Sequence, residues 1–230
     1  MKKIRYSLIL VISLIAIFTF NSCNNDDGYS LGNYRLDIAT VNAIDSAAGT
    51  FYLTLDNGST LLPVASDSYY KPQFNKRVIV NYTPLSDKTG VYDHAIKINA
   101  IQDILTKEVI DLTSENEKEI GKDPIKILDL WTGDHFLNIH FGYNTGGEKI
   151  HVINLVRNNL DKIAPSPNGT ITLEFRHNAN GDPQRYGTKN YVAFDLRPFQ
   201  TENRDSVNFI IKVFDFNDET KEYPITYKYK

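Results

Sequence analysis

The chain has 230 residues with 25 basic and 28 acidic side chains, and its formal net charge of −3 argues against a strongly basic nucleic-acid-binding protein. A single cysteine excludes an internal disulfide framework and a cysteine-rich zinc site. Tyrosine (14) and phenylalanine (12) are abundant, which favours β structure, in one large domain or two small ones.

The first 22 residues have the pattern of a secretory signal peptide. Lys2, Lys3 and Arg5 form a basic region, and an apolar run follows from residue 8 to residue 18. That run is too short to span about 30 Å of hydrocarbon comfortably as a permanent helix, which favours cleavage over an uncut anchor. Removal of residues 1–22 leaves a mature chain of 208 residues with 22 basic and 28 acidic side chains, a net charge of −6.

The only cysteine, Cys23, directly follows this segment. The tetrapeptide Phe20-Asn21-Ser22-Cys23 resembles the relaxed lipobox of Bacteroidetes lipoproteins, in which the cysteine is acylated and becomes the first mature residue. Each buried methylene of an acyl chain contributes about 0.8 kcal/mol to membrane binding, so two or three chains anchor a protein stably. We therefore expect lipidation at Cys23, with outer-membrane lipid as a partner.

The residues behind the cysteine predict a tether. Residues 23–32 are polar and rich in Gly and Asn, which is typical of a flexible segment. Asn25, Asp26 and Asp27 resemble the acidic surface-export signal of Bacteroidetes lipoproteins. That resemblance implies a body facing the cell exterior, and the alternative is a plain solvated tether.

Residues 33–110 predict a small OB-like barrel, because five short strands, the last of them long, occur within about 75 residues. Alternating apolar and polar residues indicate half-buried strands. The turn Asp56-Asn57-Gly58-Ser59 contains an Asn-Gly pair, a strong hairpin signal. The predicted strands cover residues 34–41, 50–55, 60–64, 77–82 and 94–105.

The composition changes in residues 111–124, which we interpret as a linker with a short helix. Thr113 or Ser114 would cap the helix and Gly121 would end it. Residues 125–230 then predict an immunoglobulin-like antiparallel β-sandwich, giving an all-β protein. Its seven predicted strands cover residues 125–131, 136–143, 150–156, 170–176, 191–196, 207–214 and 223–229.

The sequence contains none of the short motifs of serine hydrolases, zinc proteases, phosphate-binding loops or dinucleotide-binding folds. The single thiol is expected to carry lipid, which excludes cysteine catalysis. We therefore predict a protein that is not an enzyme, with no catalytic residue, no metal and no cofactor. Carboxylate pairs of glycosidases have no short signature, so an accessory enzyme remains the alternative.

Two histidines could face each other across a hairpin. A four-residue turn at residues 144–147 would place His140 opposite His151 on the outer face of a sheet. No carboxylate at the right offset completes a metal site, so we expect ordinary cross-strand partners.

Oxygen-bearing side chains alternate at Asn178, Asn180 and Asp182. This spacing is similar to half of a calcium-binding loop, but the terminal glutamate of such a loop is missing. The segment therefore predicts a polar hairpin loop.

Aromatic residues near basic ones suggest a binding site on the first domain. OB-like barrels bind oligonucleotides or sugars by stacking on aromatic side chains, and Tyr69, Tyr70 and Phe74 lie beside lysines. A nucleic-acid partner is excluded as implausible for an exported acidic protein. The remaining interpretations are a sugar or peptide contact, or a loop packed on the barrel.

Two short segments are candidate modification sites. Asp45-Ser46-Ala47 and Asp205-Ser206-Val207 resemble the pattern that Bacteroides species O-glycosylate. Ser46 and Ser206 are therefore candidate O-glycosylation sites, in agreement with an envelope location.

Residues at the start of the second domain carry a family resemblance: Gly121-Lys-Asp123-Pro124-Ile125, then Trp131-Thr-Gly133-Asp, then Phe136-Leu137-Asn138-Ile139-His-Phe141. With the lipoprotein start, this order resembles the NigD-like lipoproteins of Bacteroidetes, which carry an N-terminal OB-like domain and a C-terminal β-sandwich. We interpret Trp131 and the strand 136–141 as sandwich core. The resemblance supplies no catalytic residue, and the family name implies a bacteriocin-related role only by association.

The sequence thus predicts a lipid-anchored outer-membrane protein, facing the cell surface, that presents a non-catalytic binding surface to an unknown protein or glycan. Immunity to a bacteriocin, by binding the toxin or masking its receptor, is one form of this function. The alternative is a glycan-binding or accessory enzyme component of an outer-membrane uptake system.

Overall fold

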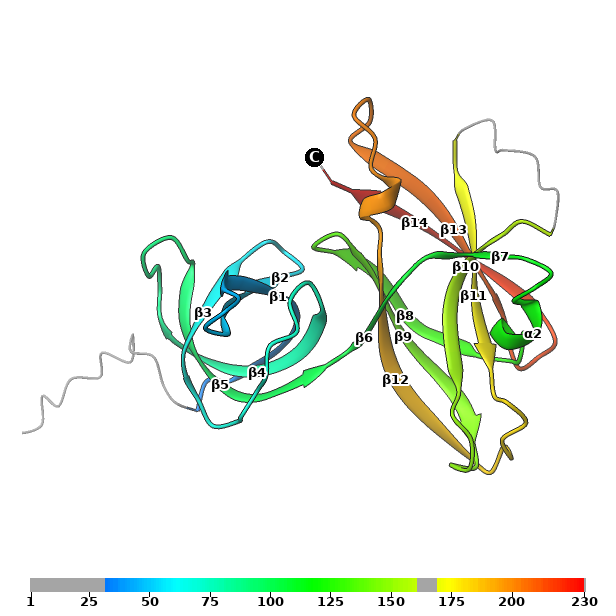
Figure 1. Ribbon diagram of the computed structural model, residues 1–230, viewed down its shortest axis with the longest axis horizontal. Coiled ribbons are helices and arrows are strands. Elements are labelled where there is room, and N and C mark those ends of the chain that lie inside the picture. Colours follow the sequence, from blue (N-terminus) through cyan, green and yellow to red (C-terminus); the bar gives the residue numbers. More distant parts are fainter. Residues whose placement is uncertain (1–31, 161–168, 230) are drawn as a thin grey trace, which may run out of the picture.

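The structure is a computed structural model that describes residues 32–160 and 169–229. Two β domains follow each other along the chain, a closed barrel and a two-sheet sandwich (Figure 1). The predicted lipidation and export residues, Cys23, Asn25, Asp26 and Asp27, lie outside the described residues. Within residues 32–160 and 169–229, no helix has the length and apolar character needed to cross a membrane.

The barrel has the strand order β1-β2-β3-β5-β4, and β4 pairs back with β1 to close it. Alternate residues of each strand point inward and fill the interior with aliphatic side chains, such as Val41, Leu53 and Val80. The predicted Asn-Gly hairpin joins β2 to β3. The strands are β1 (Arg35–Asp45), β2 (Thr50–Leu55), β3 (Thr60–Ser66), β4 (Arg77–Ser86) and β5 (His94–Asp103).

The second domain packs a five-stranded sheet against a four-stranded sheet. The first sheet contains, in spatial order, β14 (Thr220–Lys228), β13 (Ser206–Phe214), β11 (Ile171–Asn178), β10 (Val152–Asn158) and β7 (Ile110–Leu112). The second contains β6 (Leu105–Glu108), β12 (Tyr186–Asp195), β9 (Phe136–Thr145) and β8 (Lys126–Gly133), and the 3₁₀ turn η1 (Arg197–Phe199) follows β12. The buried core between the sheets includes Leu137, Phe141, Leu155, Phe175, Phe194 and Ile211.

The predicted architecture, an OB-like barrel followed by a β-sandwich, is confirmed. All seven strands predicted for the second domain are present, and β6 and β7 are added to them. Each added strand pairs in parallel, β6 with β12 and β7 with β10, and β11 pairs in parallel with β13. The sandwich is therefore mixed in strand direction, and the prediction that it is purely antiparallel is wrong.

The added strands move the domain boundary. Residues 105–112 lie in the two sandwich sheets, whereas the sequence assigns residues 33–110 to the barrel and residues 111–124 to a linker. Strand β5 runs through the buried Ile104 into β6 with no turn signal, so local alternation alone cannot show where the chain changes sheet. The predicted short helix is α2 (Glu117–Ile120), which ends at Gly121 with a φ of 70° as predicted. It starts after Asn116, so the predicted cap at Thr113 or Ser114 is wrong.

The predicted pairing of His140 with His151 is wrong. Strand β9 lies between β8 and β12, while β10 belongs to the other sheet. His140 pairs with Tyr191 and stacks on its ring at 4.4 Å between centroids. The apolar faces of β9 and β10 meet across the core instead of side by side, because each strand buries one face against the opposite sheet.

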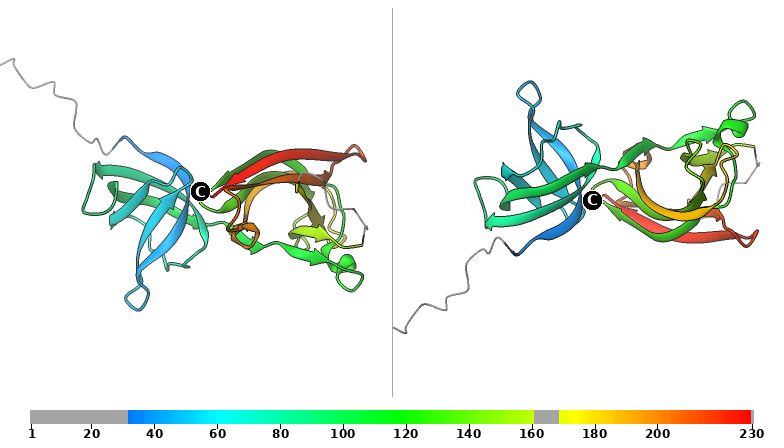
Figure 2. Two further views of the ribbon diagram at one scale, coloured as in Figure 1. Left: turned by 90° about the horizontal axis from the view of Figure 1, so that it is seen from above. Right: turned by 90° about the horizontal axis from the view of Figure 1, so that it is seen from below.

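The two domains meet where the β2–β3 turn lies against the β8–β9 hairpin, and both views of Figure 2 show barrel and sandwich side by side. Gly133 at the end of β8 permits this approach. A Cβ atom on Gly133 would lie 2.2 Å from the Cγ atom of Asp56. The missing side chain is therefore a requirement of the domain contact.

We expect Gly133→Ala to lower the free energy of unfolding by about 1–3 kcal/mol, the usual cost of overpacking a tight contact. Urea unfolding would measure the change. Gly187→Ala on β12 is the matched control, because its Cβ would meet the nearest heavy atom at an ordinary 3.7 Å. Equal effects of the two substitutions would contradict a close domain contact at Gly133.

Candidate functional site

A buried arginine lies at the contact between the two domains. The side chain of Arg77, at the start of β4, is fully buried and forms an ion pair with Asp56. It also donates to Thr40 Oγ1 at 2.8 Å and lies 5.2 Å from the centre of the Phe136 ring. Burial lowers the pKa of the Arg77 guanidinium from its usual value, and the neighbouring Asp56 carboxylate opposes that shift.

The same carboxylate reaches the sandwich. Asp56 Oδ2 accepts hydrogen bonds from Trp131 Nε1 at 2.7 Å and from Asn138 Nδ2 at 3.4 Å. One barrel residue thus binds the start of β4 with one oxygen and strands β8 and β9 with the other. An ionised carboxylate has enough acceptor positions for all of these donors.

The interpretation of Trp131 as sandwich core is wrong. Its neighbour Leu130 packs against the core, so Trp131 lies on the outer face of the sheet, facing the barrel. The strand 136–141 divides in the same way: Leu137 and Ile139 lie in the core, while Asn138 points to the barrel. Strand alternation was the available signal, but alternation does not show that a second domain covers the outer face.

A cleft of about 280 Å³ lies beside this contact. The barrel contributes residues of β1 and β4, with Leu36, Ile38 and Ile79 on its outer face, and the sandwich contributes aromatic side chains from β8 and β12. The lining residues are Leu36, Asp37, Ile38, Asp56, Ile79, Trp131 and Tyr191. Ligand sites of this kind, mainly apolar with a few polar groups, occur preferentially at domain interfaces.

The side chains that line this cleft, which we call the joint cleft, are held in place by contacts with their neighbours. Tyr191 stacks on His140 with an angle of 12° between the rings, and Trp131 is fixed by its hydrogen bond to Asp56. Asp37 accepts a hydrogen bond from Tyr82 at 2.9 Å, and burial together with that bond raises the pKa of Tyr82 to about 12. The joint cleft offers aromatic and aliphatic surface beside the Asp56 carboxylate, which suits a ligand with an apolar face and hydrogen-bond donors.

The aromatic residues singled out on the barrel lie elsewhere. Tyr69 is 95% exposed, whereas Tyr70 packs edge-on against Phe51 and donates to Asp103 at 2.7 Å. Phe74 is half-buried against the barrel core. Tyr70 borders a groove of about 290 Å³ on the barrel surface, and binding by this group remains a prediction.

The two candidate glycosylation sites differ in exposure. Ser46 is exposed in the β1–β2 turn, where the Asp45 carboxylate accepts hydrogen bonds from the backbone amides of Ala47 and Ala48. Ser206 is half-buried at the start of β13 and pairs with Lys228. Glycosylation at either serine remains a prediction.

The loop around Asp182 is organised by hydrogen bonds within the chain. Asp182 is buried, and its carboxylate accepts bonds from the Thr145 hydroxyl and from four backbone amides in residues 146–149. Burial raises its pKa, but these bonds together with one from His151 outweigh that effect and hold the pKa well below its usual value. The predicted polar loop is therefore present, and in the described ranges no cluster of three His, Cys, Asp or Glu side chains could hold a metal.

The Asp182 carboxylate also ends a hydrogen-bonded chain through two buried histidines, His151 and His177, which we call the histidine relay. His177 Nδ1 lies 3.1 Å from the Pro124 carbonyl oxygen, so it must donate, which leaves Nε2 of neutral His177 as an acceptor. His151 Nδ1 lies 2.7 Å from that Nε2, and His151 Nε2 lies 3.1 Å from Asp182 Oδ2. With His177 neutral, the bond between the rings runs from His151 Nδ1 to His177 Nε2, and His151 Nε2 faces the Asp182 carboxylate.

Comparison with known families agrees with this architecture. The family model for the NigD-like N-terminal OB domain matches residues 38–104, and the model for the NigD-like C-terminal β-sandwich domain matches residues 108–227. The fold and the contact between barrel and sandwich define a two-domain β protein with an interdomain cleft. This chain belongs to the NigD-like family.

Solved structures with the same fold come from related bacteria. A protein described as toxin related from Parabacteroides distasonis is 33% identical, with a TM-score of 0.72, and the match covers 85% of this chain and 94% of that one. A protein of unknown function from Bacteroides vulgatus is 27% identical, with a TM-score of 0.73 and coverages of 86% and 91%. A NigD-like immunity protein from Bacteroides caccae is 22% identical, with a TM-score of 0.66 and coverages of 88% and 100%. No curated protein matches the chain.

The histidine relay gives a prediction for stability against pH. Burial, reinforced by the nearby His151 ring, lowers the pKa of His177, so below about pH 6.5 this residue binds more protons in the unfolded chain than in the folded one. We expect the free energy of unfolding to fall as the pH drops below that value, with a slope of at most about 1.4 kcal/mol per pH unit from this residue. Urea unfolding between neutral and mildly acidic pH would measure the slope.

The matched variants for this measurement are His177→Gln and His94→Gln. Glutamine at position 177 can donate to Pro124 and accept from His151 without gaining a charge, so we expect a flatter profile. His94 is half-buried in the barrel, outside the relay, so His94→Gln shows how far the loss of a histidine elsewhere changes the slope. A slope in His177→Gln that matches the wild type would contradict a neutral His177 in the folded protein.

Proposed function

We propose that this protein is a lipid-anchored envelope protein that acts by binding, and that the joint cleft is its binding site. The observation that carries the proposal is the pair of fixed aromatic side chains, Trp131 and Tyr191, at the domain contact. Pre-organised aromatic surface binds ligands with a small loss of conformational entropy. The exposed Leu36, with 63% of its surface accessible, extends this surface at the edge of the barrel.

The carboxylates of the cleft favour binding over catalysis. A glycosidase needs two carboxyl groups free to act as acid, base or nucleophile. Asp56 is occupied by Arg77 and Trp131, and Asp37 accepts from Tyr82. These engagements support a structural and recognition role for both groups.

Lipidation at Cys23 and export to the cell surface complete the proposal. The family assignment supports an envelope protein, and the segment from Cys23 to the first strand supplies a polar tether with Asp26 and Asp27 close to the lipid. Surface exposure would place the joint cleft in contact with molecules outside the cell.

Two ligand classes follow from different observations. Aromatic rings beside carboxylate acceptors suit the apolar faces and hydroxyl groups of a glycan, which would make the protein a component of an uptake system. The immunity protein of Bacteroides caccae shares the fold and supports a bacteriocin-related role. Deletion of the gene distinguishes the two: immunity predicts a larger inhibition zone around a bacteriocin-producing strain, and an unchanged zone contradicts it.

We expect Cys23→Ser to move the protein from the membrane fraction to the soluble fraction, because acyl chains supply the anchor. Fractionation followed by immunoblotting would measure this. Surface exposure is tested separately by protease treatment of intact cells carrying the wild-type protein. Retention of Cys23→Ser in the membrane would contradict lipidation, and full protection from protease would contradict export.

We expect Tyr191→Ala to weaken ligand binding roughly tenfold or more, because a buried aromatic contact is a typical binding hot spot. Purified mature protein on a glycan array, and chemical cross-linking on intact cells, would measure binding to sugars and to proteins. Tyr186→Ala is the matched control, since Tyr186 lies on the same strand, is 55% exposed and does not line the cleft. Equal loss in both variants, or no effect of Tyr191→Ala, would contradict the cleft as the binding site.

A further inference from the structure

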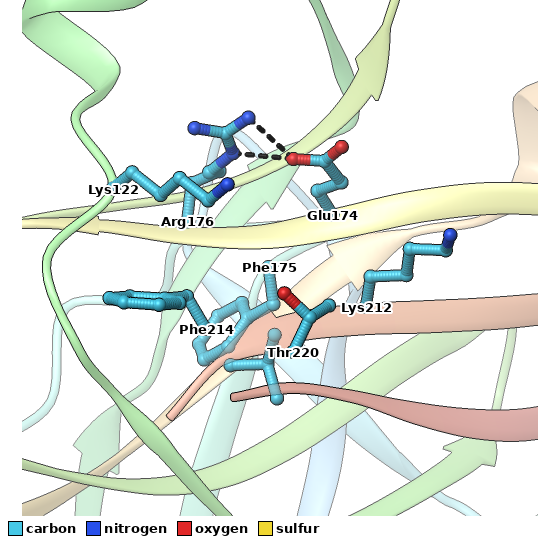
Figure 3. Close-up of a pocket in the computed structure, with 8 residues that line it drawn as sticks. Lys122, Glu174, Phe175, Arg176, Lys212, Phe214 and Thr220 are labelled. Carbon is cyan, nitrogen blue, oxygen red and sulfur yellow. Dashed lines mark hydrogen bonds and ion pairs between the residues drawn. The ribbon is translucent and has the colours of Figure 1, made fainter. Parts of the chain in front are cut away.

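A second pocket, lined by other residues than the joint cleft, lies on the outer face of the five-stranded sheet. Its volume is about 170 Å³, and strands β11, β13 and β14 form it together with the segment that follows α2 (Figure 3). The lining side chains include three cations and one carboxylate: Lys122, Arg176, Lys212 and Glu174. An excess of positive groups around a small hollow attracts anions.

The carboxylate in this pocket is fully engaged. Glu174 Oε2 accepts from Arg176 Nε at 2.6 Å and from Arg176 Nη2 at 2.5 Å, and its Oε1 accepts from Asn158 at 2.7 Å. The side chains of Arg176 and Glu174 are only 7% and 15% exposed. This ion pair forms one rigid side of the pocket and has no net charge, so Glu174 is not free to bind a cation.

Hydrogen-bond donors remain on the opposite sides of the pocket. Lys122 Nζ lies 5.7 Å from the centre of the Phe214 ring and makes no hydrogen bond or ion pair with the described residues. Lys212 makes one surface ion pair, at 3.1 Å with Glu222. Figure 3 shows Lys122 and Phe214 at the left of the pocket, Thr220 in the middle and Lys212 at the right. The Thr220 hydroxyl also has no bond to the described residues.

We propose that this pocket binds an oxyanion group, a carboxylate, sulfate or phosphate, between Lys122 and Lys212. The two ammonium groups and the Thr220 hydroxyl supply donors, and the oxyanion accepts from Lys122 and shares Lys212 with Glu222. The Phe214 ring holds Lys122 over the pocket by a cation–π contact. This site does not depend on the joint cleft.

Two-dimensional ¹⁵N–¹H NMR of the mature chain tests the proposal. Inorganic phosphate, inorganic sulfate and glucuronate are titrated separately, and glucose serves as the neutral match for glucuronate. We expect each anion to shift the amide signals of Phe214 and Thr220, and glucose to leave them in place. Tighter binding of glucuronate than of phosphate would identify a carboxylated sugar as the source of the group, and the reverse would identify a free oxyanion.

Variants connect the shifts to the lysines. Lys122→Gln and Lys212→Gln are each expected to weaken binding roughly tenfold, because each removes a charge-assisted hydrogen bond. Lys189→Gln, an exposed lysine on β12, and Tyr191→Ala in the joint cleft are expected to leave anion binding unchanged. The urea unfolding midpoint of each variant shows whether the fold is intact. Absence of shifts with all three anions, or equal binding by wild type and both lysine variants, would overturn the proposal.

Discussion

The ion pair between Asp56 and Arg77 is the interaction on which the arrangement of the two domains depends. A fully buried guanidinium is costly unless a charged partner and further hydrogen bonds compensate it, and removal of one partner of such a pair typically costs about 3–5 kcal/mol. Here the partner lies in the β2–β3 turn, and its second oxygen binds Trp131 in the sandwich. The charge that stabilises the start of β4 therefore also fixes the position of β8.

Because Asp56 contacts both domains, it also helps to fix the shape of the proposed binding site. The cleft is formed by side chains from two domains, and a cleft between independently moving domains would lose its shape. Asp56 contacts both sides, and Gly133 lets the two backbones approach closely enough for that contact. A rigid joint makes the aromatic surface of Trp131 and Tyr191 available without the entropic cost of ordering it on binding.

Much of the fold could be predicted from the sequence because its signals are local. Alternation of apolar and polar residues marks the strands, and the Asn57-Gly58 turn marks the first hairpin. What could not be predicted depends on contacts between distant residues. Trp131 and Leu137 are both apolar residues on strands, and only the packing of the barrel on one face of the sheet distinguishes the joint from the core. His140 and His151 were misplaced for the same reason, because strand spacing does not show which sheet a strand joins.

The account predicts that barrel and sandwich move as one body, held by Asp56, Arg77 and Trp131. Measurement of ¹⁵N relaxation on the mature chain tests this most directly. Backbone amides of β1–β5 and of β6–β14 are expected to fit a single rotational diffusion tensor. Two separate tensors, with a shorter correlation time for the smaller barrel, would contradict a rigid joint and with it the joint cleft as a pre-formed binding site.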